Sequence, residues 1–247
     1  MPVFDYTNSP YVIRSDIGIK HREYWEHLAA PGSWWTDEER INIAQEFRNA
    51  RSCEFCRERK QELSPYTLKG THGEAGSLNE VTVDAVHRVV TDQERITQRF
   101  VDDIAQQGIS DAEYVELVGV VVAVLSIDEF HRALGLPLEK LPAPVKGEPD
   151  YYRPAQAVKD IGFVPTLRHD GATGNEADLW SNGRTANVLR ALTLVPDALR
   201  HWRALASAQY LSLEAMANFG KSADRSIDRM QMELVAGRVS AINLCFY

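Results

Sequence analysis

The hydrophobic residues of this chain recur three and four positions apart over most of its length, which is the spacing of amphipathic helices. Prolines, glycines and small polar residues interrupt the pattern at intervals typical of helix ends. Helices are predicted over about 15–30, 37–62, 79–91, 92–108, 111–135, 180–195, 196–211 and 224–239. No segment requires a strand, so we predict an all-α protein.

Two capping boxes mark helix starts in the first half of the chain. Thr36 is followed three positions later by Glu39, and Ser110 by Glu113. The box at Ser110 opens the most hydrophobic segment of the sequence. Residues 120–124 alone would also fit a buried strand, but the length of the segment and its capped ends favour a helix. A helix that is apolar on nearly every face is expected at the centre of its unit or between subunits.

Prolines concentrate in the middle of the sequence and predict a stiff, extended linker. A chain of 247 residues can form one large domain or two of about 100–150 residues. We therefore expect an N-terminal arm with a short helix (1–36), a first helical unit (37–141), the linker (142–177) and a second helical unit (178–247).

Composition and charge limit the classes of function. Hydrophobic residues make up 44% and charged residues 25% of the sequence, as in ordinary globular proteins. A net charge of -8 argues against binding to nucleic-acid phosphates. No apolar run reaches the roughly 20 residues of a membrane span, and the first residues lack the features of a signal peptide. We expect a cytoplasmic protein without a nucleic-acid or membrane partner.

Two of the three cysteines form a Cys-x-x-Cys pair at Cys53 and Cys56. This spacing suits an intramolecular disulfide or two ligands of a zinc ion. Neighbouring arginines and Lys60 favour a lowered thiol pKa and redox chemistry, although nearby glutamates partly offset them. Zinc needs two further ligands, and the nearest candidates, His72 and His87, do not form a second close pair in the sequence. We assign no metal and no cofactor, and a pair of buried core cysteines stays an alternative.

Three further residues are candidates for proton transfer or thiol chemistry. His87 shares a helical stripe with Val83 and Val90 and could face the cysteine pair as a proton carrier, or be a packed histidine bonded to a carbonyl. Glu233 precedes Cys245 by twelve positions and could help remove its proton. The alternative is a solvated carboxylate and a small buried thiol.

The end of the chain resembles a motif of the alkylhydroperoxidase D (AhpD-like) and carboxymuconolactone decarboxylase superfamily. In the AhpD-like branch a glutamate is followed by eleven residues, Cys-x-x-Cys, three residues and a histidine. Glu233 and Cys245 match the first two positions, and the second cysteine would stand directly after Tyr247. Residues 109–118 and 187–192 resemble helices that flank the motif in the same superfamily.

The closest likeness is to two-unit alkylhydroperoxidase-related (seleno)proteins, which implies two AhpD-like helical bundle units in tandem, the second incomplete. A selenocysteine codon UGA read as a stop would end the chain at Tyr247, so we expect a truncation there. In the first unit Ile41 stands at the motif glutamate and Lys60 at the motif histidine. Glu39 or Glu46 could reach the thiols only with a different geometry.

The resemblance implies a peroxidase-like thiol or selenol oxidoreductase that reduces a peroxide through a cysteine pair and takes electrons from a thiol reductant. It also implies a homo-oligomer. In the longer protein it assigns resolution to Cys245, attack to the residue after Tyr247 and proton handling to Glu233. In this chain the vicinal pair is Cys53 and Cys56. The alternatives are a non-catalytic structural or interaction protein with buried or zinc-binding cysteines, and a decarboxylase or lactone-acting enzyme.

Overall fold

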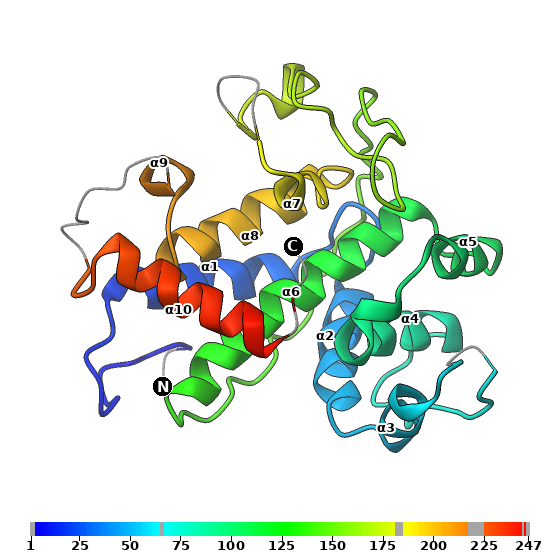
Figure 1. The fold of residues 1–247 in the computed structure, drawn as a ribbon, viewed down its shortest axis with the longest axis horizontal. Coiled ribbons are helices and arrows are strands. Elements are labelled where there is room, and N and C mark those ends of the chain that lie inside the picture. Colours follow the sequence, from blue (N-terminus) through cyan, green and yellow to red (C-terminus); the bar gives the residue numbers. More distant parts are fainter. Residues whose placement is uncertain (1–2, 65–66, 181–184, 217–224, 244, 246–247) are drawn as a thin grey trace. The chain divides into compact units, whose positions relative to one another are not determined.

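The computed structural model describes residues 3–64, 67–180, 185–216, 225–243 and 245. Over these residues the regular structure is helical, with one isolated antiparallel bridge between Val158 and Thr166 and no strand (Figure 1). The prediction of an all-α protein is confirmed. Contacts divide the chain into two compact units, Met1–Leu205 and Ala206–Tyr247.

The first unit is built around its longest helix, α6 (Asp111–Ala133). The other helices of this unit are α1 (Ser15–Ala29), α2 (Asp37–Ala50), α3 (Glu54–Gln61), α4 (Glu80–Thr91), α5 (Gln98–Gln106), α7 (Asn187–Arg190) and the first part of α8 (Pro196–Gln209). Helix α2 packs against both α4 and α6, and α1 packs against α2 and α6. The prediction that the apolar segment forms a central helix is therefore confirmed for α6, whose Leu117, Val121 and Val124 are buried in the core.

Both predicted capping boxes are present. The side chains of Thr36 and Ser110 each accept a hydrogen bond from the backbone N–H three residues on, and Glu39 and Glu113 accept from the capping residues in return. These reciprocal bonds fix the starts of α2 and α6. Asn79 caps α4 in a related way by accepting from the N–H of Thr82 at 2.9 Å.

The helix predicted over 37–62 is wrong in one respect, because the chain breaks between α2 and α3. Cys53 adopts an extended conformation (φ -66°, ψ 121°) and is the residue before α3. The hydroxyl of Ser52 donates to the carbonyl of Asn49 at 3.2 Å, a local bond that competes with continuation of the helix. The break redirects α3 so that it packs against α4.

Other predicted helices begin later in the structure than the hydrophobic pattern indicates. Trp180 lies outside any helix and its indole N–H donates to the carbonyl of His169 at 2.8 Å, while α7 begins only at Asn187. The predicted start near Asp224 lies outside the described residues. The last helix, α10 (Arg229–Ile242), begins after Asp228, whose side chain accepts from the N–H of Gln231 at 2.9 Å.

The proline-rich segment runs extended over the first unit. The N–H of Val145 donates to the carbonyl of Ala29 at 2.8 Å, and the N–H of Tyr151 donates to Ser33 at 2.8 Å. Arg153 forms a two-bond ion pair with Asp111 at the start of α6. The two backbone bonds satisfy groups that a segment without regular structure would otherwise leave unpaired, and the ion pair adds a side-chain contact to α6.

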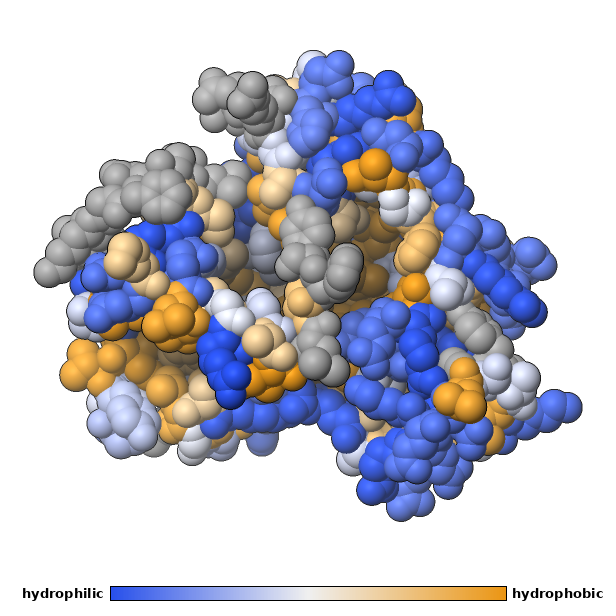
Figure 2. Space-filling model, viewed as in Figure 1, coloured by the Kyte–Doolittle hydropathy of each residue, from blue (hydrophilic) through white to orange (hydrophobic). Residues whose placement is uncertain are grey.

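The second unit contains the end of α8, the short α9 (Leu213–Met216) and α10. Figure 2 draws one face of the whole protein and shows hydrophobic residues in small patches among hydrophilic ones. Exposed large apolar side chains occur along α10 at Met230, Leu234, Val235, Val239 and Ile242. Among the described residues, no helix combines the length and apolarity needed to cross a membrane.

The N-terminal arm is held by a buried aromatic and histidine cluster. Phe4 packs edge-on to His21 and His131, and the hydroxyl of Tyr6 lies 2.6 Å from His21 Nδ1 and 2.8 Å from His131 Nε2. Burial, with the charges of His131 and Arg22, lowers the pKa of His21 to about 3. His21 is therefore neutral in the folded protein at neutral pH.

The pKa of His21 predicts a loss of stability in acid. In the unfolded chain the pKa is about 6.5, so below that pH the unfolded state binds more protons than the folded state. The contribution of His21 is complete above about pH 6.5 and is lost as the pH falls, by about 2 kcal/mol at pH 5. Between about pH 6.5 and pH 5, the free energy of unfolding measured with urea should fall less for His21→Asn than for the wild type. The exposed His169→Asn should keep the wild-type decline, and an equal decline in His21→Asn would contradict this account.

Candidate functional site

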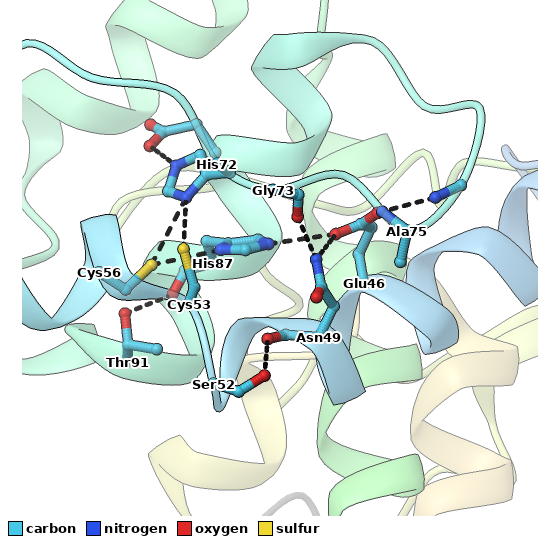
Figure 3. Close-up of polar contacts among 12 residues, drawn as sticks. Glu46, Asn49, Ser52, Cys53, Cys56, His72, Gly73, Ala75, His87 and Thr91 are labelled. Carbon is cyan, nitrogen blue, oxygen red and sulfur yellow. Dashed lines mark hydrogen bonds and ion pairs between the residues drawn. The ribbon is translucent and has the colours of Figure 1, made fainter.

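The break between α2 and α3 places both thiols of the Cys-x-x-Cys pair beside α4. Cys53 is the residue before α3 and Cys56 lies in its first turn. The two residues are 9% and 2% exposed, and neither is in a disulfide. Figure 3 shows their sulfur atoms side by side, pointing toward two histidine rings.

The two histidines come from different segments. His87 projects from α4 and is fully buried, and its Nδ1 lies 3.2 Å from Cys56 Sγ. His72 comes from the loop before α4, and its Nδ1 lies 3.5 Å from each of the two Sγ atoms. The ring centres are 4.0 Å apart. One donor atom from each of the four side chains therefore lies within 4.8 Å of the others.

A carboxylate supports each imidazole from the side away from the sulfur atoms. His87 Nε2 lies 3.1 Å from Glu46 Oε2, and His72 Nε2 lies 3.0 Å from Asp84 Oδ1. Glu46, on α2, is buried and also accepts hydrogen bonds from the backbone N–H groups of Ala75 and Gly76. Asp84 binds the guanidinium groups of Arg59 and Arg88.

The Glu46 carboxylate determines the proton position on His87. Burial opposes ionisation of Glu46, but hydrogen bonds from Asn49, Ala75 and His87 outweigh it and lower the pKa of this carboxyl. Burial and the charge of His72 lower the pKa of His87 to about 4 despite its bond to Glu46. Neutral His87 therefore donates from Nε2 to the carboxylate, which leaves Nδ1 to accept from the thiol of Cys56. Acid, imidazole and thiol form the base-and-orienter arrangement of an activated nucleophile.

His72 is in the opposite protonation state. Burial opposes its charge, but hydrogen bonds with Asp84, Cys56 and Cys53 outweigh burial and raise the pKa of His72 to about 10. Burial likewise opposes ionisation of Cys53, but the bond with His72 and contacts with Cys56 outweigh it and lower the pKa of the Cys53 thiol. These contacts therefore favour a thiolate at Cys53 beside the His72 imidazolium, an arrangement typical of reactive cysteines.

The thiols border an open cavity. A cavity of about 350 Å³ is lined by both cysteines together with Arg51, Arg57 and Lys60. A second cavity of about 310 Å³ is lined by Phe55, His72, Asp84 and Phe100 among others, and includes neither cysteine. A small molecule in the first cavity can approach Cys53 from a side lined by positive charges.

The structure brings together three of the five residues singled out from the sequence, which are Cys53, Cys56 and His87. The other two lie in the second unit. Glu233, on α10, binds the hydroxyl of Tyr210 and lies 2.7 Å from Arg229 Nε. Cys245 is exposed and follows the helix, its N–H bonded to the carbonyl of Ser240 at 2.9 Å. An α-helix rises about 1.5 Å per residue, so Glu233 lies roughly 14 Å from the C-terminal end of α10, which Cys245 follows. The described structure therefore does not bring Glu233 and Cys245 together.

Three residues of the site were missed or given other roles from the sequence. In the sequence, Glu46 does not occupy the glutamate position of the AhpD-like motif. The feature that could have identified it is a charged residue on the apolar helix face formed by Ile43 and Phe47. His72 was weighed as a zinc ligand but lies between Gly70 and Gly73, where no periodicity indicates its direction. Nothing in the sequence around Asp84 distinguishes it from a solvated helix residue.

No protein family model, curated protein or solved structure matches this chain. The resemblance to AhpD-like proteins therefore stays a prediction from the motif.

The ion pair between His72 and Cys53 can be tested by measuring thiol acidity. His72→Asn should raise the pKa of the Cys53 thiol by about 1–2 units, because it removes both a hydrogen bond and a neighbouring positive charge. The pKa is read from the pH dependence of iodoacetamide alkylation at Cys53, followed by peptide mass spectrometry. Lys60→Ala removes an exposed, screened charge from the same cavity and should shift the pKa by less than about 0.3 unit. Equal shifts in the two variants would contradict a specific ion pair.

Proposed function

We propose that this chain is a thiol oxidoreductase that reduces a small peroxide through the Cys53 and Cys56 pair. The observation that carries the proposal is the unequal environment of the two thiols. Both sulfur atoms lie 3.5 Å from Nδ1 of the charged His72, but it is the Cys53 thiol whose pKa is lowered, by hydrogen bonds with His72 and Cys56 that outweigh burial. Cys56 Sγ also lies 3.2 Å from Nδ1 of the neutral His87, which Glu46 holds from the other side. Cys53 is therefore placed to attack the peroxide, and Cys56 to lose its proton to His87 in the second step. The sequence resemblance to AhpD-like proteins supports the same class of reaction.

The first step is attack of the Cys53 thiolate on the terminal oxygen of the peroxide. A sulfur–oxygen bond forms as the oxygen–oxygen bond breaks, which leaves Cys53 as a sulfenic acid. The departing alkoxide, or hydroxide in the case of hydrogen peroxide, takes the proton of the His72 imidazolium. Asp84 holds that ring by its Nε2 at 3.0 Å, so the proton on Nδ1 faces the sulfur atoms.

The second step closes a disulfide. His87 Nδ1, 3.2 Å from Cys56 Sγ, accepts the thiol proton while Glu46 stabilises the imidazolium that forms. The new thiolate attacks the sulfur of Cys53 and expels hydroxide, which leaves as water with the proton from His87. Two thiols and one peroxide thus give one disulfide, one alcohol and one water. An external thiol then reduces the disulfide and restores the pair.

The alternative of a non-catalytic protein with buried cysteines accounts less well for the site. Cysteines that serve only as small apolar residues need no charged partners. Here two carboxylates orient two imidazoles toward the thiols, and both cysteines line an open cavity. We further propose a homo-oligomer, supported by the exposed apolar side chains of α10.

The roles of the two thiols can be separated with single variants in a Cys245→Ser background. Wild-type pairing should give a Cys53–Cys56 disulfide with one equivalent of hydrogen peroxide. Cys56→Ser should stop at a Cys53 sulfenic acid that dimedone traps, because the resolving thiol is missing. Cys53→Ser should consume peroxide at least about tenfold more slowly, because the thiol with the lowered pKa is missing. Trapping of sulfenic acid at Cys56 instead would reverse the roles, and inert thiols in every variant would remove the proposal.

The relay through His87 predicts an effect on the second step alone. His87→Asn should slow disulfide formation by about 10²-fold or more, the usual contribution of general acid–base catalysis. The rate of the first step should change by less than about threefold, since Cys53 keeps His72, and it serves as an internal control for folding. Rapid quenching with dimedone and mass spectrometry measures both rates. An equal loss in the two steps would show that His87 has a structural role only.

A further inference from the structure

We propose that reduced Cys53, Cys56, His72 and His87 bind one Zn²⁺ ion, and that oxidation of the two cysteines to a disulfide releases it. The four donors come from the break before α3, the first turn of α3, the loop before α4 and α4 itself. They lie within 4.8 Å of one another. The binding of zinc stands on this geometry alone, whereas its release rests on the disulfide chemistry of the proposed function.

The distances between the donor atoms fit a tetrahedral zinc ion. Zinc binds thiolate at about 2.3 Å and imidazole at about 2.0–2.1 Å, so tetrahedral angles place a sulfur and a nitrogen roughly 3.6 Å apart. The observed distances are 3.5 Å from His72 Nδ1 to each sulfur and 3.2 Å from His87 Nδ1 to Cys56 Sγ. Three of the six donor pairs therefore already lie within a few tenths of an ångström of the spacing that a tetrahedral ion requires, and all six lie within 4.8 Å.

The outer nitrogens of both rings are engaged as zinc sites require. Metal-binding histidines almost always donate their second N–H to a carboxylate or carbonyl, which fixes the tautomer and the ring orientation. His72 Nε2 faces Asp84 and His87 Nε2 faces Glu46, at 3.0 and 3.1 Å. In this arrangement both Nδ1 atoms are directed toward the sulfur atoms, where the ion would lie (Figure 3).

The donor set selects the metal. Two thiolates and two imidazoles suit zinc, whereas calcium and magnesium prefer oxygen ligands and iron–sulfur clusters generally use four cysteines. Four protein donors fill a tetrahedral zinc ion and leave no position for substrate. Bound zinc would therefore slow attack of the thiolates on peroxide without preventing it, because each sulfur shares an electron pair with the ion.

A disulfide and a zinc ion exclude each other at this site. When zinc binds, His72 Nδ1 and the thiols release their protons to solvent, and each sulfur donates an electron pair to zinc as a thiolate. The same two sulfurs lose two electrons in all when they join. Hydrogen peroxide takes up these two electrons, with two protons from solvent, and becomes two molecules of water. Zinc leaves as Zn²⁺ without any change in oxidation state. Oxidation of Cys53 and Cys56 by peroxide would thus release the zinc ion.

Metal binding is tested first on the reduced full chain. Cobalt(II) should bind in a 1:1 ratio, with the intense visible bands of a tetrahedral ion and an ultraviolet thiolate-to-metal band, and zinc should displace it. Zinc should also slow alkylation of Cys53 and Cys56 by at least about tenfold and leave Cys245 unaffected as an internal control. This second readout needs no variant. Absence of both signals would overturn the proposal whether or not the protein reduces peroxide.

Variants test the donor set. Asp84→Asn should weaken zinc binding roughly 10- to 100-fold through the orientation of His72. His72→Asn should weaken it further, while the exposed His169→Asn should leave it unchanged. Wild-type affinity in His72→Asn would contradict the assigned ligands.

Release is measured by adding hydrogen peroxide to the zinc-loaded chain in the presence of a chromogenic zinc chelator. One zinc ion should appear for each Cys53–Cys56 disulfide. Zinc binding without disulfide formation would leave the metal site standing and count against the proposed function. A disulfide formed with the zinc still bound would overturn the release step.

Discussion

The site depends on one buried carboxylate. Glu46 lies on α2 and accepts hydrogen bonds from the backbone of Ala75 and Gly76, three and four residues beyond His72, and from the ring of His87 on α4. A buried carboxylate without partners would be strongly unfavourable, so these bonds constrain all three segments together. The loop that carries His72 is thereby held over the cysteines, and His87 is fixed in the tautomer that accepts from Cys56. Removing this carboxylate would release the loop and the ring at once.

Around this anchor the protein places two thiols in unlike settings at short range. Asp84 and the imidazolium of His72 favour a thiolate at Cys53, whereas Cys56 Sγ also faces Nδ1 of neutral His87, which Glu46 holds from the other side. The same inward-facing nitrogens and sulfurs that would direct a proton relay also satisfy the ligand geometry of zinc. The proposed redox chemistry and the proposed metal binding therefore use the same four side chains, and formation of the disulfide would end metal binding.

The sequence predicted much of this architecture because local signals are strong. The capping boxes at Thr36 and Ser110 and the apolar run of α6 determine helices that the structure contains. The Cys-x-x-Cys spacing identified the two cysteines of the candidate site, and the stripe of Val83 and Val90 placed His87 on the inner face of α4. The break at Ser52 was missed because a side-chain bond and tertiary packing overrule a helical pattern there. His72 and Asp84 could not be assigned, since their roles arise only when a loop and two helices meet in space.

The central claim is that Cys53 and Cys56 form a preorganised pair that reacts before any other thiol in the chain. It is tested most directly by adding less than one equivalent of hydrogen peroxide to the fully reduced protein and mapping the oxidised peptides by mass spectrometry. The account predicts that a Cys53–Cys56 disulfide, two hydrogens lighter than the reduced peptides, takes up essentially all of the oxidant while Cys245 stays reduced. Oxidation of exposed Cys245 at an equal or greater rate would contradict it.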